Sequence, residues 1–145
     1  MNRKKAVRVA CECAKLSLAY NFNNDPRPIN AIKCAESWLE GNATTDSTRI
    51  AARESAVRAC EIAYSAESDC SSSAYHAARA TYSDNPKQDL IDAIHCACFY
   101  NRAESLERCS NILAGYGLEL IFSHERFGFV DVQPYILIID VKESE

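Results

Sequence analysis

Residues 48–67, TRIAARESAVRACEIAYSAE, decide the fold class of this chain. With 3.6 residues per helical turn, the large apolar side chains fall on one face and most of the alanines on a neighbouring strip. The apolar face carries Ile50, Val57, Cys60 and Tyr64, and the strip carries Ala52, Ala56, Ala59, Ala63 and Ala66. Small residues on that strip would let another helix approach closely. The stretch therefore predicts a helix of a tightly packed bundle, with its N-terminal cap among residues 44–47.

Four further segments show helical periodicity and are separated by turn residues. They are residues 3–20, 28–40, 71–83 and 86–113, the last with a break near Asn101. We expect Pro28 to start the second of these helices. Proline suits a first helical turn and keeps the preceding residue, Arg27, out of helical geometry. Gly41 then supplies the C-terminal cap of the same helix.

Residues 118–145 differ in composition from the rest of the chain. Segments 118–122, 127–132 and 135–141 are rich in aromatic and β-branched residues and predict strands, with residues 123–126 connecting the first two. We therefore expect a mainly α fold, a bundle of about five helices over residues 1–117. A short C-terminal β-like extension, residues 118–145, packs on the same domain. This extension could also pair with a second copy and form a homodimer.

The charge distribution narrows the classes of partner. The net charge is −4, and the first 20 residues are basic, so the rest of the chain is acidic. An acidic body disfavours nucleic acid, whose binding depends on neutralising phosphates, and suits a basic protein partner. The candidate partner-binding residues are Glu61, Glu67, Asp69, Asp84, Asp89 and Asp92.

The N-terminal region and the hydropathy pattern indicate a location. No window holds about 18 consecutive apolar residues, so we predict no membrane span and no membrane partner. The first residues, MNRKK, resemble the start of a signal peptide. Arg8, Glu12 and Lys15 then interrupt any secretory apolar region, and we expect a cytoplasmic protein.

Eight cysteines are the most conspicuous reactive residues. Without a secreted context, we expect reduced thiols that pack like alanine rather than disulfides. Zinc ligation by the Cys-x-Cys pairs at positions 11–13 and 96–98 is disfavoured, since residues two apart on a helix point about 200° apart. Asp92 could orient His95 as a base, three residues along one helix, but the sequence places no nucleophile beside it. We therefore predict no metal, no cofactor and no catalytic residue. The alternatives are a cysteine-dependent enzyme or redox protein, and a metal-stabilised structural protein.

Residues 25–41, DPRPINAIKCAESWLEG, contain a motif that runs D-x-R-P, then Ala-Ile, then a tryptophan and a glycine. This resembles the immunity-protein-five-like domain family of bacterial toxin–immunity systems, which also occurs in phage proteins. Residues 51–66 and 74–78 are similar to the alanine-rich helices that follow the motif in that family, so the resemblance covers residues 6–100. It implies an all-α bundle that neutralises a toxin. We expect the motif residues to be structural, as turn, cap and core anchor: Asp25, Arg27, Pro28, Trp38 and Gly41.

These observations lead to one working hypothesis. The chain is expected to be a small non-catalytic protein of immunity or phage type, which binds and blocks a toxin, a defence protein or a host enzyme. Stoichiometric inhibition requires no catalytic residue, which agrees with a sequence that contains no catalytic constellation.

Overall fold

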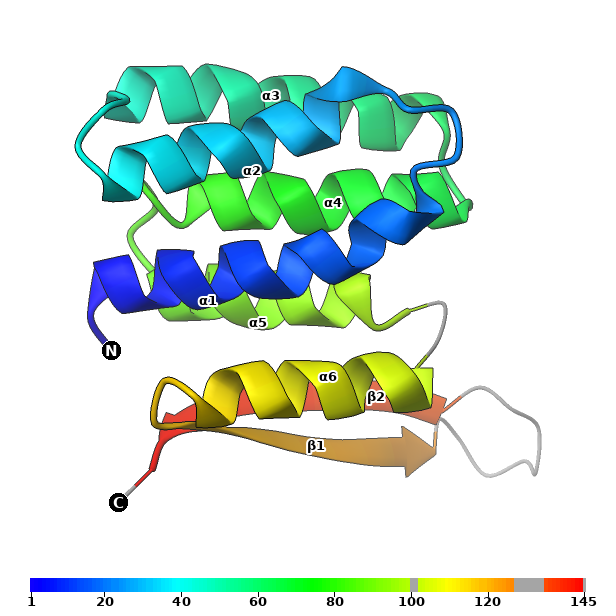
Figure 1. The fold of residues 1–145 in the computed structure, drawn as a ribbon. Coiled ribbons are helices and arrows are strands. Elements are labelled where there is room, and N and C mark those ends of the chain that lie inside the picture. Colours follow the sequence, from blue (N-terminus) through cyan, green and yellow to red (C-terminus); the bar gives the residue numbers. More distant parts are fainter. Residues whose placement is uncertain (100–101, 127–134, 145) are drawn as a thin grey trace.

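The chain folds as six α-helices followed by a β-hairpin, as seen in a computed structural model that describes residues 1–99, 102–126 and 135–144, with 123–126 and 135–137 described by their backbone alone (Figure 1). The mainly helical fold and the short C-terminal sheet, both predicted from the sequence, are confirmed. The elements are α1 (Arg3–Leu16), the 3-10 turn η1 (Ser17–Tyr20), α2 (Pro26–Leu39), α3 (Thr45–Glu61), α4 (Ala66–Arg79), α5 (Pro86–Ala97), α6 (Arg102–Ala114), β1 (Leu118–Arg126) and β2 (Tyr135–Glu143).

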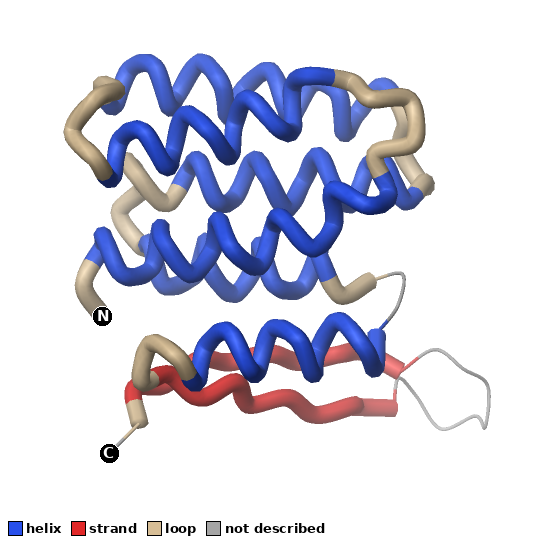
Figure 2. The backbone as a smooth tube through the Cα atoms, in the orientation of Figure 1, coloured by secondary structure: helices blue, strands red, loops and turns tan. Residues whose placement is uncertain are grey.

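Helix α4 lies at the centre of the bundle. Figure 1 shows α2 and α3 along one side of it and α1 and α5 along the other, while α6 and the hairpin lie beyond α1 and α5. Figure 2 shows that short loops connect consecutive helices from α2 to α5. Among the described residues, no helix combines the length and the hydropathy that crossing a bilayer requires.

The start of α2 differs from the prediction. The helix begins at Pro26 rather than Pro28, and Arg27 is helical. The backbone N–H groups of a first turn have no partner within the helix, so prolines at two positions of that turn remove no helical hydrogen bond. Asp25 caps this end, because its side chain accepts a hydrogen bond from the backbone N–H of Arg27.

The boundary between α3 and α4 was also predicted wrongly. Helix α3 begins three residues earlier than expected, behind Thr44 as its cap, and it ends at Glu61 instead of residue 67. Helix α4 begins at Ala66 rather than residue 71, because Ser65 caps it by accepting from the N–H of Ser68. The long alanine repeat hid this boundary, since alanine favours a helix on both sides of it.

The C-terminal third confirms one prediction and corrects another. The predicted break near Asn101 is present, because α5 ends at Ala97 and α6 begins at Arg102. Strands β1 and β2 are antiparallel, with Leu118 opposite Glu143 and Arg126 opposite Tyr135. Residues 123–126, which we expected to be a connection, therefore belong to β1, and the predicted strand 127–132 lies outside the described residues. Strand alternation turns the side chains of Leu118, Ile139 and Val141 into the core.

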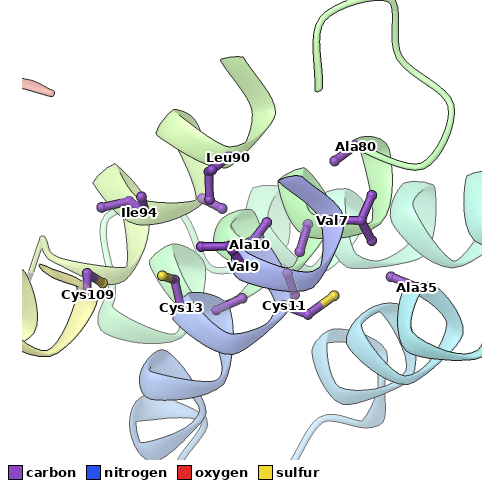
Figure 3. Packing of buried hydrophobic residues seen from close by; sticks show 14 of the residues in the cluster. Val7, Val9, Ala10, Cys11, Cys13, Ala35, Ala80, Leu90, Ile94 and Cys109 are labelled. Carbon is purple, nitrogen blue, oxygen red and sulfur yellow. The ribbon is translucent and has the colours of Figure 1, made fainter. Parts of the chain in front are cut away.

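The core is built mainly from small side chains. Alanine and cysteine make up most of the buried apolar residues of the described part, as the packing around α1 illustrates (Figure 3). Small residues allow helix axes to approach closely, and buried hydroxyls then reach neighbouring backbones. Ser55 of α3 donates to the carbonyl of Ser71 on α4 at 2.7 Å, and Ser73 donates to the carbonyl of Ala93 on α5 at 2.8 Å.

Candidate functional site

The apolar stripe of α3 faces solvent instead of the core. Ile50 is 57% exposed and Val57 is 48% exposed, whereas Thr48, Ala52 and Ser55 on the opposite side are buried. An amphipathic helix normally turns its large apolar residues inward. Here α3 packs closely against α2 and α4, and only small side chains fit between these helices. We name the exposed surface the α3 outer face; it comprises Ile50, Arg53, Val57, Cys60 and Tyr64.

Tyr64 ends this face in a strained conformation. Its φ is 64°, a left-handed value that a bulky side chain rarely adopts. Its side chain is fully solvent-exposed, with a relative exposure of 104%. Such strain costs about 1 to 2 kcal/mol and is found at functional sites more often than elsewhere. The conformation therefore costs stability while it presents an aromatic ring to solvent.

A hollow lined by arginines and tyrosines borders the α3 outer face. Two adjoining depressions, of about 480 and 360 Å³, share Arg49, Arg79 and Tyr82 as walls. The guanidinium of Arg49 stacks over the Tyr82 ring, 4.5 Å from its centroid. We name this surface the arginine–tyrosine hollow; its residues are Arg49, Arg53, Tyr75, Arg79 and Tyr82.

Asp89 forms the buried end of this hollow. Its side chain accepts a short hydrogen bond from the hydroxyl of Ser83, and its Oδ1 lies 3.3 Å from Nδ1 of His76. Oδ2 of Asp92 lies 3.9 Å from the same nitrogen, so the structure places Asp92 beside His76 on α4. This cluster was not predicted from the sequence. The signal was spacing, because His76 and Asp89 are equally far from the short α4–α5 turn and an antiparallel helix pair brings such positions together.

The same cluster has donors of the type that bind a divalent cation. Ligand atoms of His76, Asp89 and Asp92 lie within 4.8 Å of one another. The guanidinium of Arg79 competes for this position, because its Nη1 lies 3.7 Å from Oδ1 of Asp89. Asp89 is also already bonded to Ser83. These contacts make Asp89 an anchor of the α4–α5 turn.

The start of the motif at residues 25–41 belongs to an ion-pair network near the C-terminal end of α3. Nη2 of Arg27 lies 2.8 Å from Oδ2 of Asp25 and 2.6 Å from Oε2 of Glu61. Arg58 contacts Glu67 at 2.8 Å and Asp25 at 3.4 Å. Hydrogen bonds from Arg27 lower the pKa of Asp25 to about 2. These contacts connect α2, α3 and α4.

The remaining motif residues lie in the fold as a structural role requires. Pro28 is buried, and Trp38 packs on the core. Gly41 has a φ of 79°, and its N–H donates to the carbonyl of Trp38 at 3.1 Å, which ends α2 in the left-handed conformation that glycine adopts without strain.

The six predicted partner-binding carboxylates do not form one surface. Glu61 and Glu67 are engaged by Arg27 and Arg58. Asp69 is partly buried, and burial raises its pKa. Asp89 is only 2% exposed, while Asp92 lies beside His76 and Asp84 is exposed. A basic partner stays a prediction, and Glu61, Asp84 and Asp92 keep the most exposed side chains of the six.

Five of the eight cysteines are buried in the core, where Sγ of Cys98 lies 3.8 Å from Sγ of Cys109. Figure 3 shows Cys13 pointing towards Cys109 of α6 and Cys11 pointing away from it, towards Ala35 of α2. Burial raises the pKa of Cys11 and of Cys96 to about 12. A nucleophilic cysteine needs the opposite shift. Cys60, on the α3 outer face, is exposed.

Comparison with known protein families, with curated proteins and with solved structures finds no match for this chain. The two adjoining surfaces, the α3 outer face and the arginine–tyrosine hollow, are therefore the basis for the functional argument.

Proposed function

We propose that this chain is a non-catalytic binding protein of inhibitory or immunity type, which blocks a target protein by docking the α3 outer face into it. The observation that carries the proposal is the outward direction of Ile50 and Val57 on a helix whose inward side is made of small residues. Large apolar side chains exposed together on one helix are typical of protein-binding surfaces.

The spacing of these residues suits a groove on the target. Ile50 and Val57 are seven residues apart, two helical turns, and therefore lie above one another on the same side of α3. Helix-in-groove recognition uses anchors with this spacing. Tyr64 adds an aromatic ring beyond the helix end, and tyrosine is among the residues that contribute most to binding energy at interfaces. The target is thus expected to contribute an apolar groove.

The first test is affinity capture from cells that naturally produce the chain, with a double substitution Ile50→Glu and Val57→Glu. Two charges on the face would prevent burial in an apolar groove, so a stoichiometric partner held by the wild type should be lost. Phe22→Ser is the matched control, because Phe22 is exposed but lies between α1 and α2, outside the face. A partner retained equally by the double variant would refute docking through α3.

Cys60 offers a second readout on the same complex. This thiol is exposed and lies on the α3 outer face, so it should react with a soluble thiol reagent in the free protein and be protected in the complex. The half-buried Cys34 on α2 provides an internal control whose labelling rate should be unchanged. Equal labelling of Cys60 with and without the partner would place the interface elsewhere.

Self-association through the hairpin is a second candidate. Ile121 and Ile138 are each 41% exposed, and alternation along the paired strands puts them on the same side of the sheet. A second copy that covers this side would explain their exposure. Light scattering of Ile121→Lys against wild type tests this candidate: a dimer in the wild type and a monomer in the variant would support it, whereas a monomeric wild type would exclude it.

A further inference from the structure

Three arginines converge on the arginine–tyrosine hollow, which has two carboxylates, Asp84 and Asp89, along its other side. Arg49 and Arg53 extend from α3, and Arg79 extends from the last turn of α4. Within the described ranges, neither Arg49 nor Arg53 makes an ion pair or a side-chain hydrogen bond with the protein. Arg79 has one carboxylate neighbour, Asp89, at 3.7 Å. Because the whole chain carries a net charge of −4, this local excess of positive charge is unexpected.

Contacts within the hollow hold the Arg49 side chain in a defined position. Stacking on Tyr82 holds the Arg49 guanidinium over the ring, since cation–π contact favours this position. Burial raises the pKa of Tyr82, so its phenol remains a proton donor at neutral pH. Asp84 and Asp89 line the α5 side of the hollow. An anion would therefore be repelled from that side and held on the α3 side, between Arg49, Arg53 and Arg79.

We propose that the arginine–tyrosine hollow binds a phosphate group through Arg49, Arg53 and Arg79. A phosphate dianion presents three oxygens and can accept paired hydrogen bonds from several guanidinium groups at once, which a single carboxylate cannot do. This site shares Arg53 with the α3 outer face, but it does not depend on the docking proposed for that face.

The test is titration of the full-length protein with inorganic phosphate at low salt, followed by NMR of the arginine Nε–H groups. Signals of Arg49 and Arg79 should shift first and saturate. The double variant Arg49→Gln and Arg79→Gln should bind at least about tenfold more weakly, which corresponds to the loss of about 1.4 kcal/mol. Arg108→Gln is the matched control, because Arg108 is exposed on α6 and pairs with Glu104.

Two further probes define the ligand. Acetate should bind at least about tenfold more weakly than phosphate, since it carries one charge and two oxygens. A phosphoserine peptide and a nucleoside monophosphate distinguish a phosphorylated protein side chain from a small phosphorylated molecule. If either binds more tightly than inorganic phosphate, the site is supported and that compound shows which kind of molecule carries the phosphate group. The proposal is overturned by equal affinity for acetate, by unchanged binding in the double variant, or by no saturation below about 10 mM phosphate.

Discussion

Arginines on the two sides of α3 differ in burial and in their ionic contacts. Arg58 lies on the side towards α2 and α4, where its side chain is 13% exposed and contacts the carboxylates of Asp25 and Glu67. Arg53, five residues earlier, is exposed on the outer face. The fold compensates the charge of Arg58, whereas Arg53 has no carboxylate partner among the residues that the structure describes. Charge compensation therefore distinguishes an arginine that holds the structure together from one that is available for recognition.

The apolar residues of α3 differ in the same way. The inward positions are filled by Thr48, Ala52 and Ser55, and the outward positions by Ile50 and Val57. Packing with close neighbours sets the inward residues, because larger ones would force the helices apart. The outward residues are about half exposed, so packing constrains their size much less. A pattern that the fold does not require is the kind of local inconsistency expected at a functional surface.

The largest expected effect comes from breaking the compensated side. Arg58→Ala should lower the free energy of unfolding by about 3 kcal/mol, because it removes a largely buried guanidinium and leaves the carboxylate of Glu67 without its partner, while Asp25 keeps only Arg27. Arg53→Ala, on the same helix, should change it by no more than about 0.5 kcal/mol. Urea unfolding of the two variants measures the contrast. Equal effects of the two substitutions would mean that the network around Arg58 is not what stabilises this edge of α3.

A smaller effect, with a pH signature, is expected at Asp25. Asp25→Asn keeps an N-cap but removes the charge, and it should cost about 2 kcal/mol at pH 7. The pKa of Asp25 is lowered to about 2 in the folded protein by hydrogen bonds from Arg27, against about 3.9 when unfolded. Its contribution is therefore complete above pH 4 and is lost as the pH falls towards 2. Unfolding curves over this range should converge for wild type and variant, and parallel curves would contradict the assignment.

The positions of the helices and strands were easier to predict from the sequence than the face that each helix buries. Periodicity predicted the helices and the break between α5 and α6, because these depend on local pattern and on turn residues. Of the alanine strip predicted for α3, Ala52 is buried, whereas Ala63 lies beyond the helix end and Ala66 begins α4. What periodicity could not decide is which of two plausible faces the bundle buries. That choice depends on the spacing between α3 and its neighbours, which is a tertiary property.

The candidate site shows the same limit. Glu61 and Glu67 read as members of an acidic surface, but they lie opposite Arg27 and Arg58 and are neutralised. The local sequence identifies each carboxylate, but the arginine that neutralises it comes from another helix. The stacking of Arg49 on Tyr82 joins the start of α3 to the turn after α4 across 33 positions, and it depends on the full length and close packing of this helix pair. The cluster of His76 and Asp89 could have been predicted, because α4 and α5 are an antiparallel helix pair joined by a short turn.

The smallest expected effect separates stability from binding on the outer face. Tyr64→Gly should raise the free energy of unfolding by about 1 kcal/mol, since glycine adopts a φ of 64° without strain. The same change should weaken capture of the partner by at least about tenfold if the ring is an anchor. Ala63→Gly is the matched control: its φ is not positive, so it should destabilise slightly and leave the partner bound. A Tyr64→Gly variant that is more stable and binds as well as wild type would show that the strained tyrosine serves another purpose than docking.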